Sequence, residues 1–508
     1  MARLKKQSAA EAERSRLVEG AGTGRDSSAW RLNPKYIAPR RGWRGAGSGR
    51  SAHTDPGAVY LGTTKQVSGL YPFILGASLP PEGVPIGPDL LTNELVCFDP
   101  AGWVGRLTQN PGVWVMAQPG AGKSALAKRV SNVYASYGHK IMIPGDVKGE
   151  YASLVESLGG QVVRIGRGLD RLNPLDSGPL KRQLPYLPRE RQDALREEIT
   201  GRRSELLHAL LATPHGLDRR PTAPEANVVG HVLALIADQQ DDDPVIPDVV
   251  KVLREGPQTL WSQLMVDTAE DYRDQVRAVT LALENLCRGP LSGLFDRPTT
   301  RPLDLEASAL SVDLSALLSA GPQVVATGML ATWAYSYGQV DSARAVGLMD
   351  TPLVLILDEM WRALRSGPGL VDAMDSMTRL NRSKNEVTLM ITHSLLDLEA
   401  LPTEEDRNKA RGLMDRCDSL VLGALSSGEL ERVNAQRPLT GEEQKLVASW
   451  SAPALTGVDG TSQRHPGRGK YLIKIGTRAG SPARMDLTTD EVKAYWTDPA
   501  MSRAGEDA

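Results

Sequence analysis

The chain has 508 residues, of which 41% are hydrophobic and 24% are charged, and its formal net charge is −2. This composition is typical of a soluble globular protein, and the length predicts more than one substructure. No stretch reaches the roughly 18 consecutive apolar residues of a membrane span, and the charged start lacks the apolar core of a signal peptide. We therefore expect a cytoplasmic protein. Cys97, Cys287 and Cys417 are too far apart to predict a zinc site or a disulfide framework.

The first 57 residues are predicted to be a disordered basic arm. Residues 1–50 carry 12 Lys or Arg and 4 Asp or Glu, a net charge of +8, which leaves −10 on the rest of the chain. The arm has too few apolar residues to fold alone. Its charge favours attraction to DNA or anionic lipid, with Trp43 available to stack on a base, and the alternative is a solubilising tail.

A β-rich lead-in is predicted for residues 58–110, where short apolar runs alternate with Pro and Gly. The next residues, 112–124, read GVWVMAQPGAGKS, an apolar strand that enters a Gly-rich turn ending in Lys-Ser. A helical pattern follows at 125–138. This order predicts a P-loop, in which backbone N–H groups hold nucleotide phosphates.

Each P-loop position has an expected role. Gly120 and Gly122 allow the backbone dihedrals of the turn, Lys123 reaches the β and γ phosphates, and Ser124 binds Mg²⁺. Ala117 replaces the usual first glycine, so it must fit without a positive φ. The residues predicted to contact the nucleotide are Gly120, Ala121, Gly122, Lys123, Ser124, Ala125 and Thr392.

The first half of the nucleotide core is predicted over 111–177. Strands at 113–116, 140–146 and 161–166 alternate with helices, which predicts a parallel sheet. Asp146 and Glu150 follow the second strand, where open α/β sheets place ligand groups. We expect both beside the site, and the alternative is that they stabilise the turn.

An all-α insertion is predicted over 178–300, because this stretch has amphipathic helical patterns and no convincing strand. The second half of the core, 301–497, then has strand patterns at 310–317, 353–357, 387–392 and 418–425. Helical patterns lie at 322–337 and 371–381. A hairpin is predicted between 470–476 and 482–487 through Gly480, and residues 498–508 are predicted to be a disordered tail.

The strand at 353–357 carries a second motif. It lies in PLVLILDE, a continuous apolar run that is typical of a strand buried on both faces and that ends in two carboxylates. Asp358 is predicted to hold Mg²⁺ through water, and Glu359 to act as general base on the attacking water. The alternative is a core strand with two solvated acids.

A polar pair, Thr392 and His393, follows the apolar residues 387–391 of this strand pattern. His393 is predicted to sense the γ-phosphate through a ring N–H, which would couple activity to pH. The alternative is a histidine that only caps the edge of the sheet.

Together these motifs resemble the cytoplasmic ATPases of conjugative type IV secretion systems, a branch of the HerA and FtsK superfamily of hexameric RecA-like motors. The resemblance extends over roughly residues 60–496. It rests on five stretches: 84–100, 144–176, 289–300, 355–364 and 379–398.

The resemblance implies a RecA-like P-loop NTPase fold, ATP and Mg²⁺ as ligands, a homo-hexamer, and membrane-embedded secretion or conjugation components as partners. It also implies an arginine that reaches the γ-phosphate of the neighbouring subunit. Arg382 is the first candidate and Arg379 the second, and a solvated charge at a helix end is the alternative for each. We expect a cytoplasmic location, with peripheral attachment at the inner face of the cell membrane as a variant.

Two other functions stay open on the sequence. One is a DNA translocase or coupling protein of the same superfamily, which the acidic charge outside the arm disfavours. The other is a nucleotide-binding scaffold with little turnover, which the presence of Lys123, Ser124, Asp358 and Glu359 disfavours. An Asn-Lys-x-Asp guanine signature is absent from the sequence, so we expect ATP rather than GTP.

Overall fold

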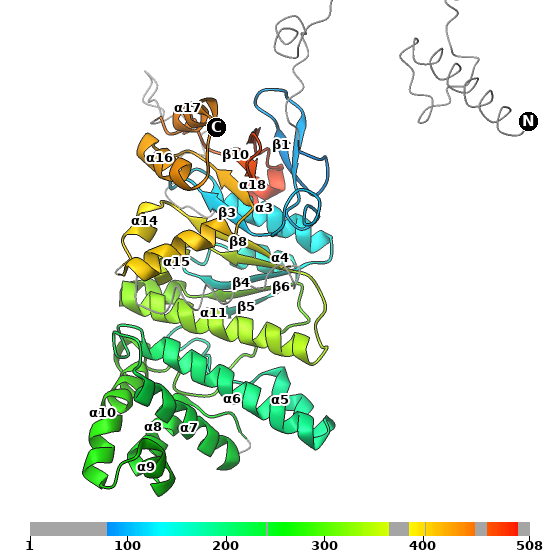
Figure 1. Ribbon diagram of the computed structural model, residues 1–508. Helices are drawn as coiled ribbons and strands as arrows, with labels where there is room; N and C mark the ends of the chain where they lie inside the picture. Colours follow the sequence, from blue (N-terminus) through cyan, green and yellow to red (C-terminus); the bar gives the residue numbers. More distant parts are fainter. Residues whose placement is uncertain (1–78, 240–241, 365–385, 402, 453–464, 496–508) are drawn as a thin grey trace, which may run out of the picture. The chain divides into compact units, whose positions relative to one another are not determined.

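The computed structural model describes residues 79–239, 242–364, 386–401, 403–452 and 465–495 (Figure 1). These residues belong to one compact unit, 75–508. The predicted basic arm and C-terminal tail lie outside the described residues, as do the predicted helix at 371–381 and both candidate arginines, Arg379 and Arg382.

A nine-stranded sheet forms the centre of this unit, in the order β11-β10-β9-β3-β8-β7-β4-β6-β5. The strands from β9 to β5 are parallel, and β10 and β11 are antiparallel. Their bounds are β3 Val113–Met116, β4 Lys140–Asp146, β5 Gln161–Arg164, β6 Ala309–Asp313, β7 Leu353–Leu357, β8 Glu386–Thr392, β9 Ser419–Leu422, β10 Lys470–Ile475 and β11 Ser481–Arg484. The predicted, mainly parallel sheet is confirmed.

The sheet is buried on both faces, which explains the continuous apolar strands. In β3, Val113 and Val115 belong to one hydrophobic cluster, whereas Trp114 and Met116 belong to the other. This alternation follows from the two-residue period of a strand. Helices α3 (Lys123–Ser136), α4 (Ala152–Ser157) and α18 (Thr489–Tyr495) contribute to the first cluster, and α11 (Pro322–Ala345) contributes to the second.

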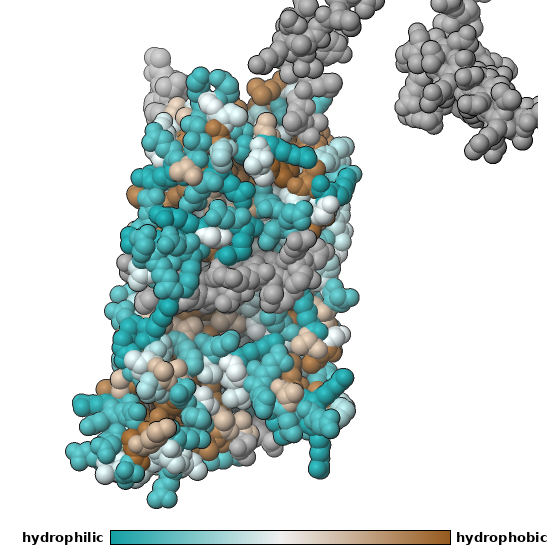
Figure 2. All heavy atoms as spheres, in the orientation of Figure 1, coloured by the Kyte–Doolittle hydropathy of each residue, from teal (hydrophilic) through white to brown (hydrophobic). Residues whose placement is uncertain are grey.

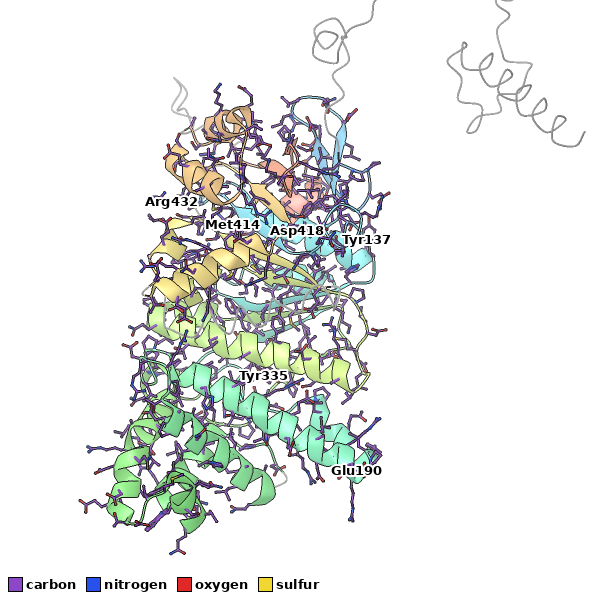
Figure 3. All side chains as sticks on the ribbon, in the orientation of Figure 1. Tyr137, Glu190, Tyr335, Met414, Asp418 and Arg432 are labelled. Carbon is purple, nitrogen blue, oxygen red and sulfur yellow. The ribbon has the colours of Figure 1, made fainter. Side chains whose placement is uncertain are left out.

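Helices make up the insertion, and the described residues of 178–300 contain no strand. They are α5 Pro179–Gln183, α6 Arg189–Leu211, α7 Ala223–Gln239, α8 Ile246–Glu255, α9 Gln258–Leu264 and α10 Ala269–Leu286, with short 3-10 helices η2 Leu184–Tyr186 and η3 Gly289–Leu291. Helix α6 packs on α11, so α11 lies between the sheet and the insertion (Figure 1). Tyr335 is buried on α11 at this boundary (Figure 3).

Several element bounds differ from the sequence prediction. The strand predicted at 310–317 ends at Asp313, and the 3-10 helix η4 (Ser315–Ala320) follows it. Helix α11 extends to Ala345, eight residues past the predicted end at 337. Short helices that were not predicted lie among the last strands: α12 Met360–Leu364, α14 Leu396–Glu399, α15 Glu404–Asp415, α16 Ser427–Gln436, α17 Gly441–Trp450 and α18.

The lead-in forms a separate two-stranded antiparallel sheet of β1 (Val84–Pro88) and β2 (Leu95–Phe98). It is tied to the nine-stranded sheet, because Asp418, just before β9, accepts hydrogen bonds from the backbone N–H groups of Gln109 and Asn110 (Figure 3). This contact holds the residues before the P-loop strand against its neighbour β9.

Hydrophilic and apolar residues are interspersed over the face of the molecule in Figure 2. Large apolar side chains that are exposed include Leu91, Leu95, Tyr186 and Met265. None of the helices in the described part of the chain has both the length and the apolarity that crossing a membrane requires.

Candidate active site

The turn between β3 and α3 has the backbone of a P-loop. Gly120 has a φ of +78° and Gly122 a φ of +103°, which side-chain-bearing residues rarely adopt. Ala117 is outside the left-handed region and is accommodated by Gly423, where a Cβ atom would lie 2.6 Å from the Cβ of Ala117. Tyr471 of β10 donates a hydrogen bond from its hydroxyl to the carbonyl of Gly122, at 2.7 Å. The antiparallel end of the sheet therefore holds the turn in place.

Lys123 is the first residue of α3, and its side chain is folded back onto the turn. Its Nζ donates to the carbonyls of Ala117 and Gln118, at 2.7 and 3.1 Å. Burial lowers the pKa of Lys123 to about 8, although the nearby carboxylates of Asp358 and Glu359 oppose that shift. A buried ammonium whose hydrogen-bond partners among the described residues are backbone carbonyls is suited to an anionic ligand.

The start of α3 provides further groups for phosphate. The first turn has no acidic residue, and no side chain caps it. Its backbone N–H groups are therefore available, and the helix dipole favours negative charge at that end. Together with Lys123 and the hydroxyl of Ser124, these residues fit the phosphates of a nucleotide and its Mg²⁺.

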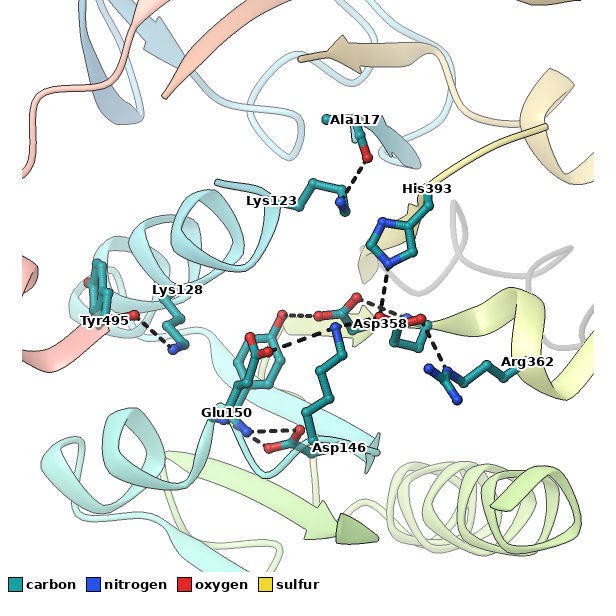
Figure 4. Close-up of polar contacts among 12 residues, drawn as sticks. Ala117, Lys123, Lys128, Asp146, Glu150, Asp358, Arg362, His393 and Tyr495 are labelled. Atoms are coloured by element: carbon teal, nitrogen blue, oxygen red, sulfur yellow. Dashed lines mark hydrogen bonds and ion pairs between the residues drawn. The ribbon is translucent and has the colours of Figure 1, made fainter. Parts of the chain in front are cut away.

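Asp358 and Glu359 follow β7, and both carboxylates interact electrostatically with Lys123 of this turn. Figure 4 shows Asp358 together with Lys123 and His393. Asp358 is half-buried and accepts hydrogen bonds from the hydroxyl of Tyr151 and from the backbone N–H of Glu359, both at 2.8 Å. Burial raises the pKa of Asp358, and the neighbouring Glu359 raises it further. A bound cation would favour the ionised form, which is consistent with a Mg²⁺ ligand.

Glu359 is buried and has a φ of +54°, a conformation that costs a non-glycine residue about 1 kcal/mol or more. Its Oε1 accepts from Lys148 Nζ at 2.6 Å and from His393 Nε2 at 3.0 Å. Its Oε2 accepts from Trp361 Nε1 at 2.8 Å and from Arg362 Nε at 3.3 Å. Burial alone would raise the pKa of Glu359, but the bonds from His393 and Lys148 hold it well below its usual range.

His393 therefore does more than cap the sheet edge, because it contacts Glu359. Its Nδ1 is buried without a hydrogen-bond partner among the described residues. Thr392, the residue before it, donates from its hydroxyl to the carbonyl of Ser394 at 3.3 Å. Whether either residue contacts a nucleotide stays a prediction.

The loop after β4 supplies residues that were not predicted for the site, namely Lys148 and Tyr151. Asp146 accepts hydrogen bonds from the backbone N–H groups of Glu150 and Tyr151, at 3.1 and 2.8 Å, which is the turn-stabilising alternative for Asp146. The ring of Tyr151 packs on α3, with Lys128 Nζ 5.7 Å from its centroid. The sheet order, in which β4 adjoins β7, brings this loop to Glu359.

The described residues contain no group of three or more His, Cys, Asp or Glu side chains that could hold a metal ion alone. A P-loop magnesium site does not need such a group, because the nucleotide phosphates are ligands themselves. Ser124 and Asp358 are the two residues that would hold Mg²⁺ here.

The fold and this arrangement define a P-loop NTPase with a RecA-like core. The structure is similar to VirB4 of Thermoanaerobacter pseudethanolicus, with a TM-score of 0.59 and 19% sequence identity over 82% of this chain and 100% of that chain. A second similar structure is the plasmid coupling protein TrwB in complex with ADP and Mg²⁺, with a TM-score of 0.47 and 11% identity over 75% of this chain and 86% of that chain. No protein-family model and no curated protein matches the sequence.

The fold implied by the sequence resemblance is thus confirmed by the similarity to VirB4. At this level of identity, the similarity establishes the fold. The activity has to be argued from the site.

Proposed function

We propose that this chain binds ATP with Mg²⁺ and hydrolyses it. The observation that carries the proposal is that Lys123, after β3, interacts electrostatically with Asp358 and Glu359, which follow β7 at the same edge of the sheet. Lys123 and the N–H groups of the P-loop would bind the phosphates, and Glu359 would accept a proton from the attacking water. Mg²⁺, held by Ser124 and Asp358, would neutralise charge on the phosphate oxygens.

We propose further that hydrolysis energises a conjugative DNA transfer or type IV secretion machine. The fold similarity to VirB4 and the five family-like stretches support this role. The chain would act as a homo-hexamer in the cytoplasm, attached at the inner face of the membrane to secretion or conjugation components. Arg382, or else Arg379, would complete the site of the neighbouring subunit.

A turnover assay tests the proposed activity. The purified full chain should release phosphate from ATP when Mg²⁺ is present, and removal of divalent cations with EDTA should reduce the rate at least about 100-fold, because the metal carries much of the charge stabilisation. Added Mg²⁺ in excess of EDTA should restore the rate. A chain that binds ATP but shows no Mg²⁺-dependent turnover would instead be a nucleotide-dependent scaffold.

The basic arm is the part of the chain that we propose for DNA contact, because residues 1–50 have a net charge of +8. Deleting residues 1–50 should leave ATP hydrolysis within about twofold of the full chain, but should weaken DNA binding and reduce its dependence on salt. Fluorescence anisotropy with a labelled duplex at several salt concentrations measures the effect. Equal DNA affinity with and without the arm would contradict this role.

A further inference from the structure

The carboxylate of Glu359 already accepts four hydrogen bonds from protein side chains in this structure. A carboxylate offers about four lone-pair sites, two on each oxygen. Oε1 already accepts from Lys148 and His393, and Oε2 accepts from Trp361 and Arg362. A general base must accept a hydrogen bond from the water that it activates, so one of these donors has to leave before hydrolysis.

Lys148 is the donor that can leave most easily. Trp361 and Arg362 lie two and three residues after Glu359 in the chain, and His393 is fixed at the end of the adjacent strand β8. Lys148 reaches Glu359 from the separate loop after β4, on a flexible four-carbon side chain that is 41% exposed. Its departure would leave His393 as the one described donor on Oε1 and free a site for water.

Glu150 provides a second partner for the lysine. Its carboxylate lies 3.9 Å from Lys148 Nζ. Gly149, with a φ of +68°, forms the bend between the two residues. Because Asp146 fixes the backbone N–H of Glu150, the second carboxylate stays within reach of Lys148.

We propose that Lys148 is a positioning residue that restrains Glu359 through the ion pair seen here, and that hydrolysis requires Lys148 to move from Glu359 to Glu150. The proposal rests on the ATP hydrolysis proposed above. The movement exchanges one ion pair for another, so Lys148 has a carboxylate partner in both arrangements. A bound nucleotide or a neighbouring subunit can therefore select between them.

Three variants test this exchange through kcat and KM for ATP at saturating Mg²⁺. Lys148→Met should raise kcat about fivefold, the range set by a half-exposed ion pair, with KM within about twofold of wild type. Glu150→Gln should lower kcat about fivefold, because Lys148 then loses the carboxylate that would accept it when it leaves Glu359. The double variant should match Lys148→Met, because Glu150 acts only by accepting Lys148.

Two further variants control for charge and for folding. Lys148→Arg keeps the ion pair and adds donors, so it should not raise kcat. Lys181→Met removes a lysine of similar exposure, 33%, that lies 3.7 Å from Asp243 in the insertion, and it should leave kcat unchanged. If Lys148→Met does not fold, Lys148→Gln gives the same comparison. Binding of ADP to each variant confirms an intact P-loop.

Other outcomes would overturn the proposal. If Glu150→Gln lowers kcat equally with and without Lys148, Glu150 acts on water directly. If Lys148→Met or Lys148→Gln lowers kcat, Lys148 assists the reaction rather than restraining it. A wild-type chain that does not hydrolyse ATP is a different result, because it contradicts the proposed function itself.

Discussion

Glu359→Gln should bind ATP about as tightly as the wild-type chain and hydrolyse it at least about 100-fold more slowly, which is the usual contribution of a general base. The substitution keeps the shape of the side chain and removes the carboxylate that would accept the proton. It leaves Lys123 and the P-loop untouched, so phosphate binding should persist. Equilibrium binding of a fluorescent ATP analogue and single-turnover phosphate release measure the two steps separately.

Lys123→Ala is the matched variant for the binding step. We propose that Nζ of Lys123 contacts the β and γ phosphates, so the variant that lacks it should lose most of its ATP affinity. The two variants should therefore fail at different steps. If Glu359→Gln hydrolyses ATP at the wild-type rate, the base lies elsewhere, and Glu150 is the next residue to test.

The parallel core could be predicted closely from the sequence, because strands buried on both faces leave continuous apolar runs. Strands β4 and β7 occupy the predicted residues, 140–146 and 353–357. The antiparallel pairing of β10 with β11 was also predicted, from two apolar runs around Gly480. In each case the sequence signal is a local apolar run, and a neighbouring turn marks the end of the strand.

The short helices after β8 were missed although the sequence carries their start signals. Thr403 accepts from the backbone N–H of Asp406, Ser426 from that of Glu429, and Thr440 from that of Glu443. Each is a Ser or Thr followed three residues later by an acid, the pattern of a helix N-terminus. Because the helices are short, their apolar periodicity is weak. The capping residues are the stronger sequence signal for them.

The partners of Glu359 could not be predicted from local patterns. Lys148 and Glu359 are about 200 residues apart in the chain, and they meet because β4 adjoins β7 in the sheet. The positive φ of Glu359 also has no signal in the sequence, because glutamate rarely adopts it. The motif therefore indicated Glu359 as the candidate base, whereas the strand order determines which side chains contact it.

The second large effect is expected at Arg382, which lies outside the described residues. The family resemblance implies that this arginine stabilises the γ-phosphate bound to the neighbouring subunit. Arg382→Ala should therefore reduce turnover about 1000-fold, the order of effect that an arginine finger has, while ATP binding persists. The same substitution at Arg379 should have a smaller effect. The rate of phosphate release measures the effect of each substitution. Measured at several protein concentrations, the specific activity of the wild type should rise as subunits associate.

Mixing two inactive variants tests whether the arginine acts between subunits. Arg382→Ala keeps a sound P-loop, and Lys123→Ala keeps a sound arginine. In a ring with head-to-tail interfaces and random mixing in equal amounts, about a quarter of the sites combine an intact P-loop with an intact arginine. Turnover should therefore recover to about a quarter of the wild-type rate. No recovery in mixtures that assemble normally would place Arg382 within its own subunit's site. Normal hydrolysis by Arg382→Ala alone would remove it from the reaction and leave Arg379 to be tested in the same way.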